Sequence, residues 1–194
     1  MHMDGARIAN AVASLGCHPA EVTSEAGVDI LSFGGTKNGA MLAEAAVIFN
    51  PSLAEDFAYI HKRAGQLPSK ARYVSAQLQA LLADGLWIEN GRHANAMAAR
   101  LRDGLISREG VGLLHPVEAN ELFITLPKAV ADAAMGARTC LLRLAKRGRR
   151  RLSPRHQLRH HRSGGDAVPE RLVIVVLFLL PSLFTGKVAL SEAK

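Results

Sequence analysis

The chain has 194 residues, of which 48% are hydrophobic and 21% are charged, and its formal net charge is +7. This length is enough to bury a real hydrophobic core. Two cysteines, Cys17 and Cys140, lie far apart, and the N-terminus shows no signal-peptide pattern, so neither a disulfide framework nor a zinc site is indicated and a cytoplasmic protein is expected.

The positive charge is concentrated in one segment of the chain. Residues 136–171 hold eleven Lys and Arg against Asp166 and Glu170, whereas the remaining residues comprise 13 basic and 15 acidic ones. The basic character therefore belongs to a tail and not to a globular surface.

Residues 1–135 alternate between helical and strand patterns, which predicts an α/β fold. Ile8, Val12 and Leu15 recur at helical spacing and predict a helix over 6–16. The elements predicted after it are, in chain order, a short helix over 19–27, strands over 28–35 and 44–50, helices over 51–65, 70–83 and 86–105, and a strand over 120–127.

One lysine, Lys37, lies in the glycine-rich stretch FGGTKNG that ends the first of these strands. Ligands of α/β sheets collect outside the carboxyl ends of the strands, and an amine held there could bind a carbonyl cofactor covalently. Gly34, Gly35 and Gly39 would let the backbone approach a bulky ligand closely. The alternative is an ordinary solvated loop lysine.

A possible partner for this lysine is Asp4 in the stretch HMDGAR. A carboxylate beside the ring nitrogen of pyridoxal phosphate keeps that nitrogen protonated. Arg7 could present its planar guanidinium to the carboxylate of an amino acid. The alternative is a helix entry with Asp4 as N-cap and Arg7 in the first turn, and both interpretations can hold together. The histidines show no metal-ligand spacing, and no metal is assigned.

The segments HMDGARIANA and DILSFGGTKNG, in this order, resemble the low-specificity L-threonine aldolases of the β-eliminating lyase group, and the similarity continues to about residue 130. The resemblance implies the aspartate-aminotransferase fold and pyridoxal 5'-phosphate as cofactor. By position it implies that Lys37 forms an imine with the cofactor, that Asp4 binds the ring nitrogen, that Thr36 touches the phosphate and that Arg7 binds the substrate carboxylate. The implied reaction cleaves L-threonine or L-allo-threonine, which are β-hydroxy amino acids, to glycine and acetaldehyde.

The resemblance also implies a domain organisation. Residues 1–84 would be the remainder of the cofactor-binding large domain, 85–135 a connecting helix and the start of a small α+β domain, and 136–194 a divergent, poorly ordered tail. Family members carry a long segment before the Asp4 motif, so the chain is interpreted as N-terminally truncated, with a tail such as a shifted reading frame would produce. An incomplete sheet exposes edges, which favours aggregation or dependence on a partner and puts independent activity in question.

Partners follow partly from the resemblance and partly from the tail. Intact family members imply a homo-oligomer, in which a basic residue among 62–72 reaches the phosphate of the neighbouring subunit; a solvated helix end is the alternative. The favoured interpretation of the arginine-rich tail is a disordered basic segment, and the alternative is a non-catalytic fragment whose tail binds nucleic acid without sequence preference. The apolar run 172–184 is short for a membrane span, and a buried strand is the simpler interpretation.

Overall fold

The computed structural model describes residues 1–136, 142–143 and 171–177. The chain divides into two compact units, the first formed by Met1–Ala98 with Glu118–Asn120, and the second by Ala99–Val117 with the described residues from Glu121 to Leu177. Most of the arginine-rich tail lies outside the described residues, so the nucleic-acid hypothesis stays a prediction.

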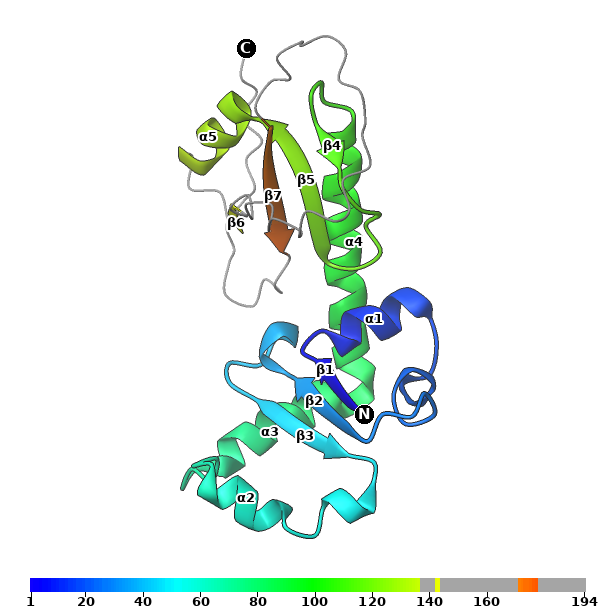
Figure 1. The fold of residues 1–194 in the computed structure, drawn as a ribbon, viewed down its shortest axis with the longest axis vertical. Helices are drawn as coiled ribbons and strands as arrows, with labels where there is room; N and C mark the ends of the chain where they lie inside the picture. The colour runs from blue at the N-terminus through cyan, green and yellow to red at the C-terminus, as the bar shows by residue number, and fades with distance from the viewer. Residues whose placement is uncertain (137–141, 144–170, 178–194) are drawn as a thin grey trace, which may run out of the picture. The chain divides into compact units, whose positions relative to one another are not determined.

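The first unit is built on a three-stranded sheet (Figure 1). Its strands are β1 (His2–Gly5), β2 (Ile30–Gly34) and β3 (Glu44–Ile48), in the order β1-β2-β3. Strands β1 and β2 run parallel, with Asp4 opposite Ser32, and β3 is antiparallel to β2, with Glu44 opposite Gly34. Because β1 and β2 are parallel, their carboxyl ends lie at the same edge of the sheet.

The helices of the first unit follow the predicted order, except that the helix predicted over 51–65 is interrupted at residues 54–56. They are α1 (Ile8–Leu15), α2 (Phe57–Arg63), α3 (Ala71–Leu82) and the part of α4 (Leu86–Ile106) up to Ala98. The 3₁₀ turns are η1 (Pro19–Val22), η2 (Thr36–Asn38), η3 (Pro51–Leu53) and η4 (Ala83–Gly85). The predicted helix over 19–27 is wrong beyond η1, because Thr23 leaves the helical conformation (φ −124°, ψ −98°). Leu15 is exposed, so the apolar side of α1 is confined to its first two turns.

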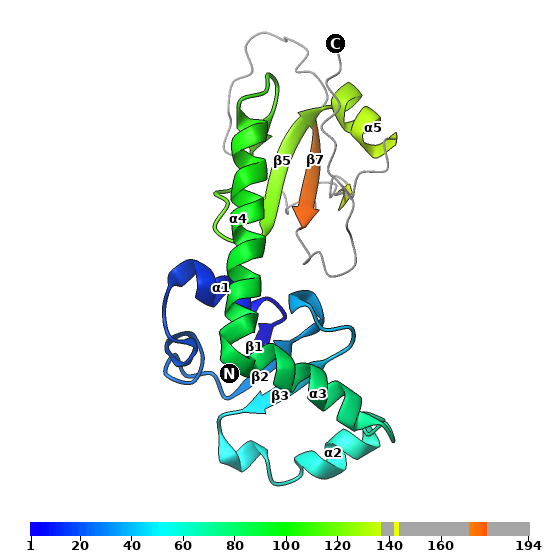
Figure 2. The same ribbon diagram turned by 180° about the vertical axis from the view of Figure 1, so that it is seen from behind.

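Helices cover one face of the sheet, and the two opposite views place α4 behind it in Figure 1 and in front of it in Figure 2. Ile8 and Val12 of α1 are buried in one cluster with residues of β2. Phe33 of β2 meets Trp87 of α4 edge-on, with ring centroids 5.6 Å apart. The other face of the sheet carries no described helix.

Helices α1 and α4 approach each other closely through small and amide side chains. A Cβ atom on Gly91 would lie 2.6 Å from the carbonyl oxygen of Ala9, so only glycine fits there without a shift. Asn10 donates to the Asn95 side chain at 2.9 Å, and the Asn95 amide donates to the Asn10 carbonyl at 2.9 Å. This pairing satisfies a buried amide, as a closely packed helix pair requires.

The second unit contains an antiparallel sheet in the order β4-β5-β7-β6. Its elements are β4 (Gly112–Leu113), β5 (Glu121–Pro127), α5 (Lys128–Gly136), β6 (Leu142–Arg143) and β7 (Arg171–Leu177). Burial alternates along β5, with Leu122, Ile124 and Leu126 inside, as a half-buried strand predicts. The first part of the apolar run 172–184 is thus a strand paired with β5. Within the described ranges, no helix has the length and hydropathy of a membrane span.

Candidate active site

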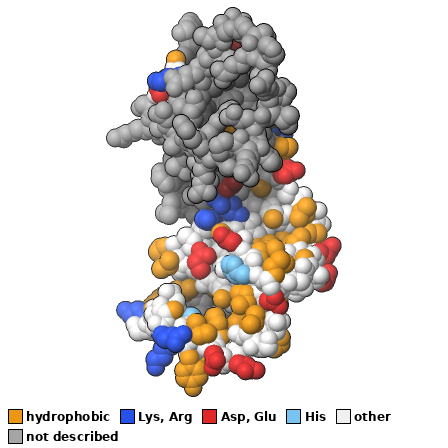
Figure 3. Space-filling view, in the orientation of Figure 1, with side chains coloured by type: hydrophobic (Ala, Val, Ile, Leu, Met, Phe, Trp, Pro, Cys, Tyr) orange, Lys and Arg blue, Asp and Glu red, His pale blue; other side chains and the backbone are white. Residues whose placement is uncertain are grey.

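The uncovered face of the three-stranded sheet brings polar side chains together. His2 and Asp4, two residues apart in β1, share this face with Ser32 of the neighbouring strand β2 and with Glu44 at the start of β3. All four residues are exposed. Figure 3 shows acidic, basic and histidine side chains among hydrophobic ones on this unit. The His2 ring nitrogen Nε2 lies 2.9 Å from the Ser32 hydroxyl, which joins β1 to β2 across this face.

Asp4 belongs to β1, so its interpretation as the N-cap of the following helix is wrong. The N-cap of α1 is Arg7, which has a half-buried side chain and φ −134°, ψ 31°. One Asp4 carboxylate oxygen accepts the backbone N–H of Ala6 at 3.0 Å, which shapes the turn out of the strand. Its other oxygen accepts no hydrogen bond from the described residues, and the side chain is exposed.

Lys37 lies in η2, which starts two residues after β2 ends, and its side chain is exposed. Its ammonium forms no ion pair with any residue in the described part of the chain. The exit from β2 touches the exit from β1, because a Cβ atom on Gly34 would lie 2.7 Å from the Cα of Ala6. The Asp4 motif and the Lys37 turn therefore meet at one edge of the sheet.

The glycines of this turn are required by the fold itself, whether or not they also approach a ligand. Gly34 packs on Ala6, and a Cβ atom on Gly35 would lie 2.5 Å from the carbonyl oxygen of Ala43. Gly39 has φ 112°, a conformation that side chains rarely adopt. Close approach is thus needed between two segments of backbone.

Hydrogen bonds fasten the start of the turn to β3. The Gly35 N–H donates to the Ala43 carbonyl at 2.9 Å. The Ala43 N–H donates to the Thr36 hydroxyl oxygen at 3.3 Å, and the Thr36 N–H donates to the Glu44 carboxylate at 3.3 Å. The Thr36 hydroxyl oxygen accepts here, and its proton is donated to no acceptor among the described residues, so it could be donated to an anion.

Two helices hold the rest of the loop. Gln77 of α3 accepts the N–H groups of Met41 and Leu42 at 2.8 and 3.2 Å. Asn38 donates its side-chain amide to the Trp87 carbonyl at 2.9 Å, and Asn90 donates to the Asn38 carbonyl at 2.9 Å. Sequence reasoning missed these amides, since single polar residues at distant positions leave no periodic signal.

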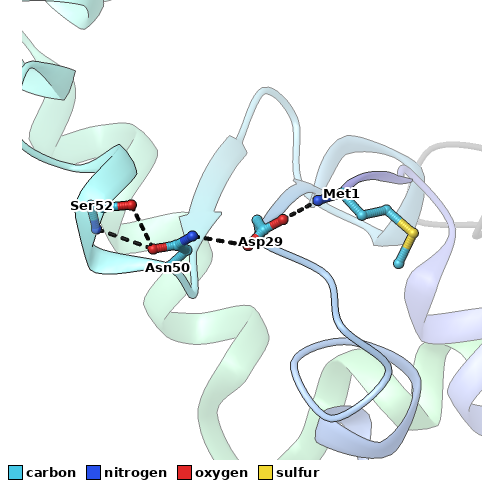
Figure 4. Close-up of polar contacts among 4 residues, drawn as sticks. All are labelled: Met1, Asp29, Asn50 and Ser52. Carbon is cyan, nitrogen blue, oxygen red and sulfur yellow. Dashed lines mark hydrogen bonds and ion pairs between the residues drawn. The ribbon is translucent and has the colours of Figure 1, made fainter.

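The opposite edge of the same sheet is tied by Asp29 (Figure 4). Its carboxylate accepts the Met1 amino group and, at 3.0 Å, the Asn50 side-chain amide. Asn50 in turn accepts the N–H and hydroxyl of Ser52. The Met1 amino group, followed by Asn50, lowers the pKa of Asp29 below its ordinary value.

Residues 1–129, about two thirds of the chain, match the family described as beta-eliminating lyase. The chain belongs to the beta-eliminating lyase family. It is 50% identical over 133 residues to the low specificity L-threonine aldolase of Pseudomonas sp. and 49% identical to that of Pseudomonas aeruginosa. In both cases the match covers 69% of this chain and 38% of the relative, so the chain spans about two fifths of their length.

A threonine aldolase of Leishmania major has a similar structure. The TM-score is 0.71 at 26% identity, and the match covers 91% of this chain and 45% of that chain. The α/β fold predicted from the sequence is confirmed, and this family member adopts part of the threonine aldolase fold.

The residues present suit pyridoxal phosphate, the cofactor of this family. The two motifs that meet at this edge carry an amine, a carboxylate and a hydroxyl, which are those of Lys37, Asp4 and Thr36. Across the sheet from Asp4, the residues paired with one another in β2 and β3 are the small Ser32 and Ala46. Among the described residues no group of three His, Cys, Asp or Glu could hold a metal ion.

Proposed function

We propose that this beta-eliminating lyase contributes to a pyridoxal-phosphate-dependent threonine aldolase that cleaves L-threonine or L-allo-threonine to glycine and acetaldehyde. The single observation that carries the proposal is the contact between Gly34 and Ala6, because it brings the Lys37 turn and the Asp4 motif to one edge of the sheet. The identity of about 50% to two enzymes named low specificity L-threonine aldolase supports it.

Each site residue has a proposed role. Lys37 holds the cofactor covalently through its amine, and Asp4 keeps the ring nitrogen protonated through its available oxygen. Thr36 donates its hydroxyl proton to the phosphate, which is consistent with its oxygen accepting from Ala43. Arg7 follows Ala6 at the same edge and binds the substrate carboxylate with its planar guanidinium.

The chemistry follows from these roles. The cofactor supplies an electron sink when it is bound. In net terms, the cleavage would break the Cα–Cβ bond and exchange the proton of the substrate's β-hydroxyl for one gained at Cα. Acetaldehyde and glycine would then form with no net gain or loss of protons. Because the Lys37 amine is exposed here, its desolvation has to come from groups other than the described residues.

The proposal also includes a homo-oligomer in the cytoplasm. Large hydrophobic side chains are exposed on α2, on α3 and in the loop before β3: Met41 is 85%, Tyr59 78% and Tyr73 59% exposed. Burial of such side chains against a second copy would be favourable. A basic residue among 62–72, in and after α2, would then reach the neighbouring copy's phosphate. Sedimentation of the purified chain tests the assembly, and a monomer at all concentrations would contradict it.

The test uses the full 194-residue chain mixed with pyridoxal phosphate. We expect the visible absorbance band of lysine-bound cofactor, and after borohydride reduction a mass increase on the peptide that contains Lys37. Lys37→Ala should abolish both signals, while Lys128→Ala, an exposed lysine paired with Asp132, should keep both. Folded chain that binds the cofactor equally well after Lys37→Ala would overturn the proposal. A separate activity assay supplies L-threonine and measures the glycine and acetaldehyde that form.

A further inference from the structure

The residue that follows Lys37 is anchored to a helix far away in the chain. Asn38 is 4% exposed, and its side-chain N–H donates to the Trp87 carbonyl of α4. Asn90, one turn further along α4, donates to the backbone carbonyl of Asn38. The turn that carries Lys37 is therefore held by α4 from both the side chain and the backbone of one residue.

The orientation of Asn38 carries a cost in stability. Its side-chain oxygen Oδ1 is buried and accepts no hydrogen bond from the residues that the structure describes. A buried acceptor without a donor is destabilising, and such groups are rare in folded proteins. An apolar side chain at position 38 would avoid this cost, so stability alone does not explain an asparagine there. Its position beside Lys37 points to a task in placing that residue.

The geometry of the turn connects this anchor to the Lys37 side chain. The N–H groups of Asn38 and Ala40 both donate to the Gly35 carbonyl, at 2.9 and 3.1 Å, so η2 is a single tight turn. Lys37 lies inside that turn and has no described ion pair of its own to hold it. Fixing Asn38 therefore fixes the direction in which the Lys37 Cα–Cβ bond leaves the backbone.

We propose that Asn38 and Asn90 are positioning residues that aim the Lys37 amine at the open sheet face. Neither touches substrate or cofactor; they act through the backbone of the Lys37 turn. The inference rests on the proposed function, because it concerns the amine that would hold the cofactor.

The decisive variant is Asn90→Ala, since alanine is the best helix former and α4 should be retained. Without cofactor, hydrogen exchange at the Asn38 and Ala40 amides should become faster. With pyridoxal phosphate, the concentration that half-saturates the Lys37-bound absorbance should rise about fivefold, as expected for one lost hydrogen bond. Asn38→Asp, which puts an oxygen against the Trp87 carbonyl, should shift both readouts in the same direction.

The matched control is Asn95→Ala, which removes a comparable amide pair between α4 and α1 at Asn10. It should lower stability without changing exchange in the Lys37 turn or the half-saturation concentration. If Asn90→Ala and Asn95→Ala change the hydrogen exchange and the half-saturation concentration by equal amounts, the effect comes from general stability and the inference is overturned. The inference is also overturned if Asn90→Ala forms the Lys37 adduct at the same cofactor concentration as the wild type. Absence of an adduct in folded wild type overturns the proposed function, and the positioning role with it.

Discussion

Gly34 packs directly on the backbone of Ala6, and a Cβ atom at Gly34 would lie 2.7 Å from the Ala6 Cα and 2.9 Å from its carbonyl oxygen. This contact joins the ends of two parallel strands, and with them the two motifs of the candidate site. Backbone atoms on both sides leave no flexible side chain to move aside, so the contact can be tested by adding a single methyl group.

Gly34→Ala should destabilise the protein by about 1 to 3 kcal/mol, the usual cost of overpacking. Urea unfolding followed by circular dichroism measures the loss. The control is Gly104→Ala in α4, where nothing lies within 4 Å of the added Cβ and helix propensity should make the protein more stable by about 1 kcal/mol. Similar stability changes in the two variants would contradict the described packing at Gly34.

Asp4→Asn tests charge without changing shape. The asparagine oxygen can still accept the Ala6 N–H, so stability should be unchanged. Affinity for pyridoxal phosphate should fall about tenfold or more, because a charge-assisted hydrogen bond to the ring nitrogen is lost. Absorbance titration measures the affinity. Glu25→Gln, which neutralises an exposed acid elsewhere, is the control; a loss of equal size there would show that only net charge matters.

Gln77→Ala should free the loop before β3, because Met41 and Leu42 lose their common acceptor. We expect a stability loss of about 1 to 2 kcal/mol and faster hydrogen exchange at these two amides. Gln77→Glu retains an acceptor oxygen and should exchange like the wild type. Gln79→Ala removes an exposed side chain on the same helix and should have little effect. If hydrogen exchange at the Met41 and Leu42 amides is unchanged in Gln77→Ala, Gln77 does not hold this loop.

The lowered pKa of Asp29 predicts a pH dependence of stability. A carboxyl group with a lowered folded-state pKa stabilises the fold fully above its ordinary value of 3.8, and this contribution is lost as the pH falls through the folded-state pKa. Asp29→Asn should therefore be less stable than the wild type at pH 7, and the difference should shrink in acid. Urea unfolding at pH 7 and pH 3 measures it, and a gap that is constant with pH would contradict the ionic contribution.

The sequence alone predicted most of the local elements, and it suggested the residues of the proposed site. Periodic apolar residues predicted α1, α4 and β5, because the spacing of apolar residues in a helix or strand is a local property of the sequence. The order of strand, glycines and Lys37 predicted a turn at the carboxyl end of β2. The parallel pairing of β1 with β2, which places Asp4 at the same edge, was visible only in the structure.

Only the tertiary structure decided how that edge is held. Gln77 and Asn90 lie on helices far along the chain from the loop that they hold. The sequence around a single amide side chain does not indicate which distant residue it bonds. The sequence did not predict that Gly34 and Gly35 pack against backbone, because backbone packing distances follow from strand placement and not from local sequence. Long-range hydrogen bonds and close packing therefore set the geometry around Lys37.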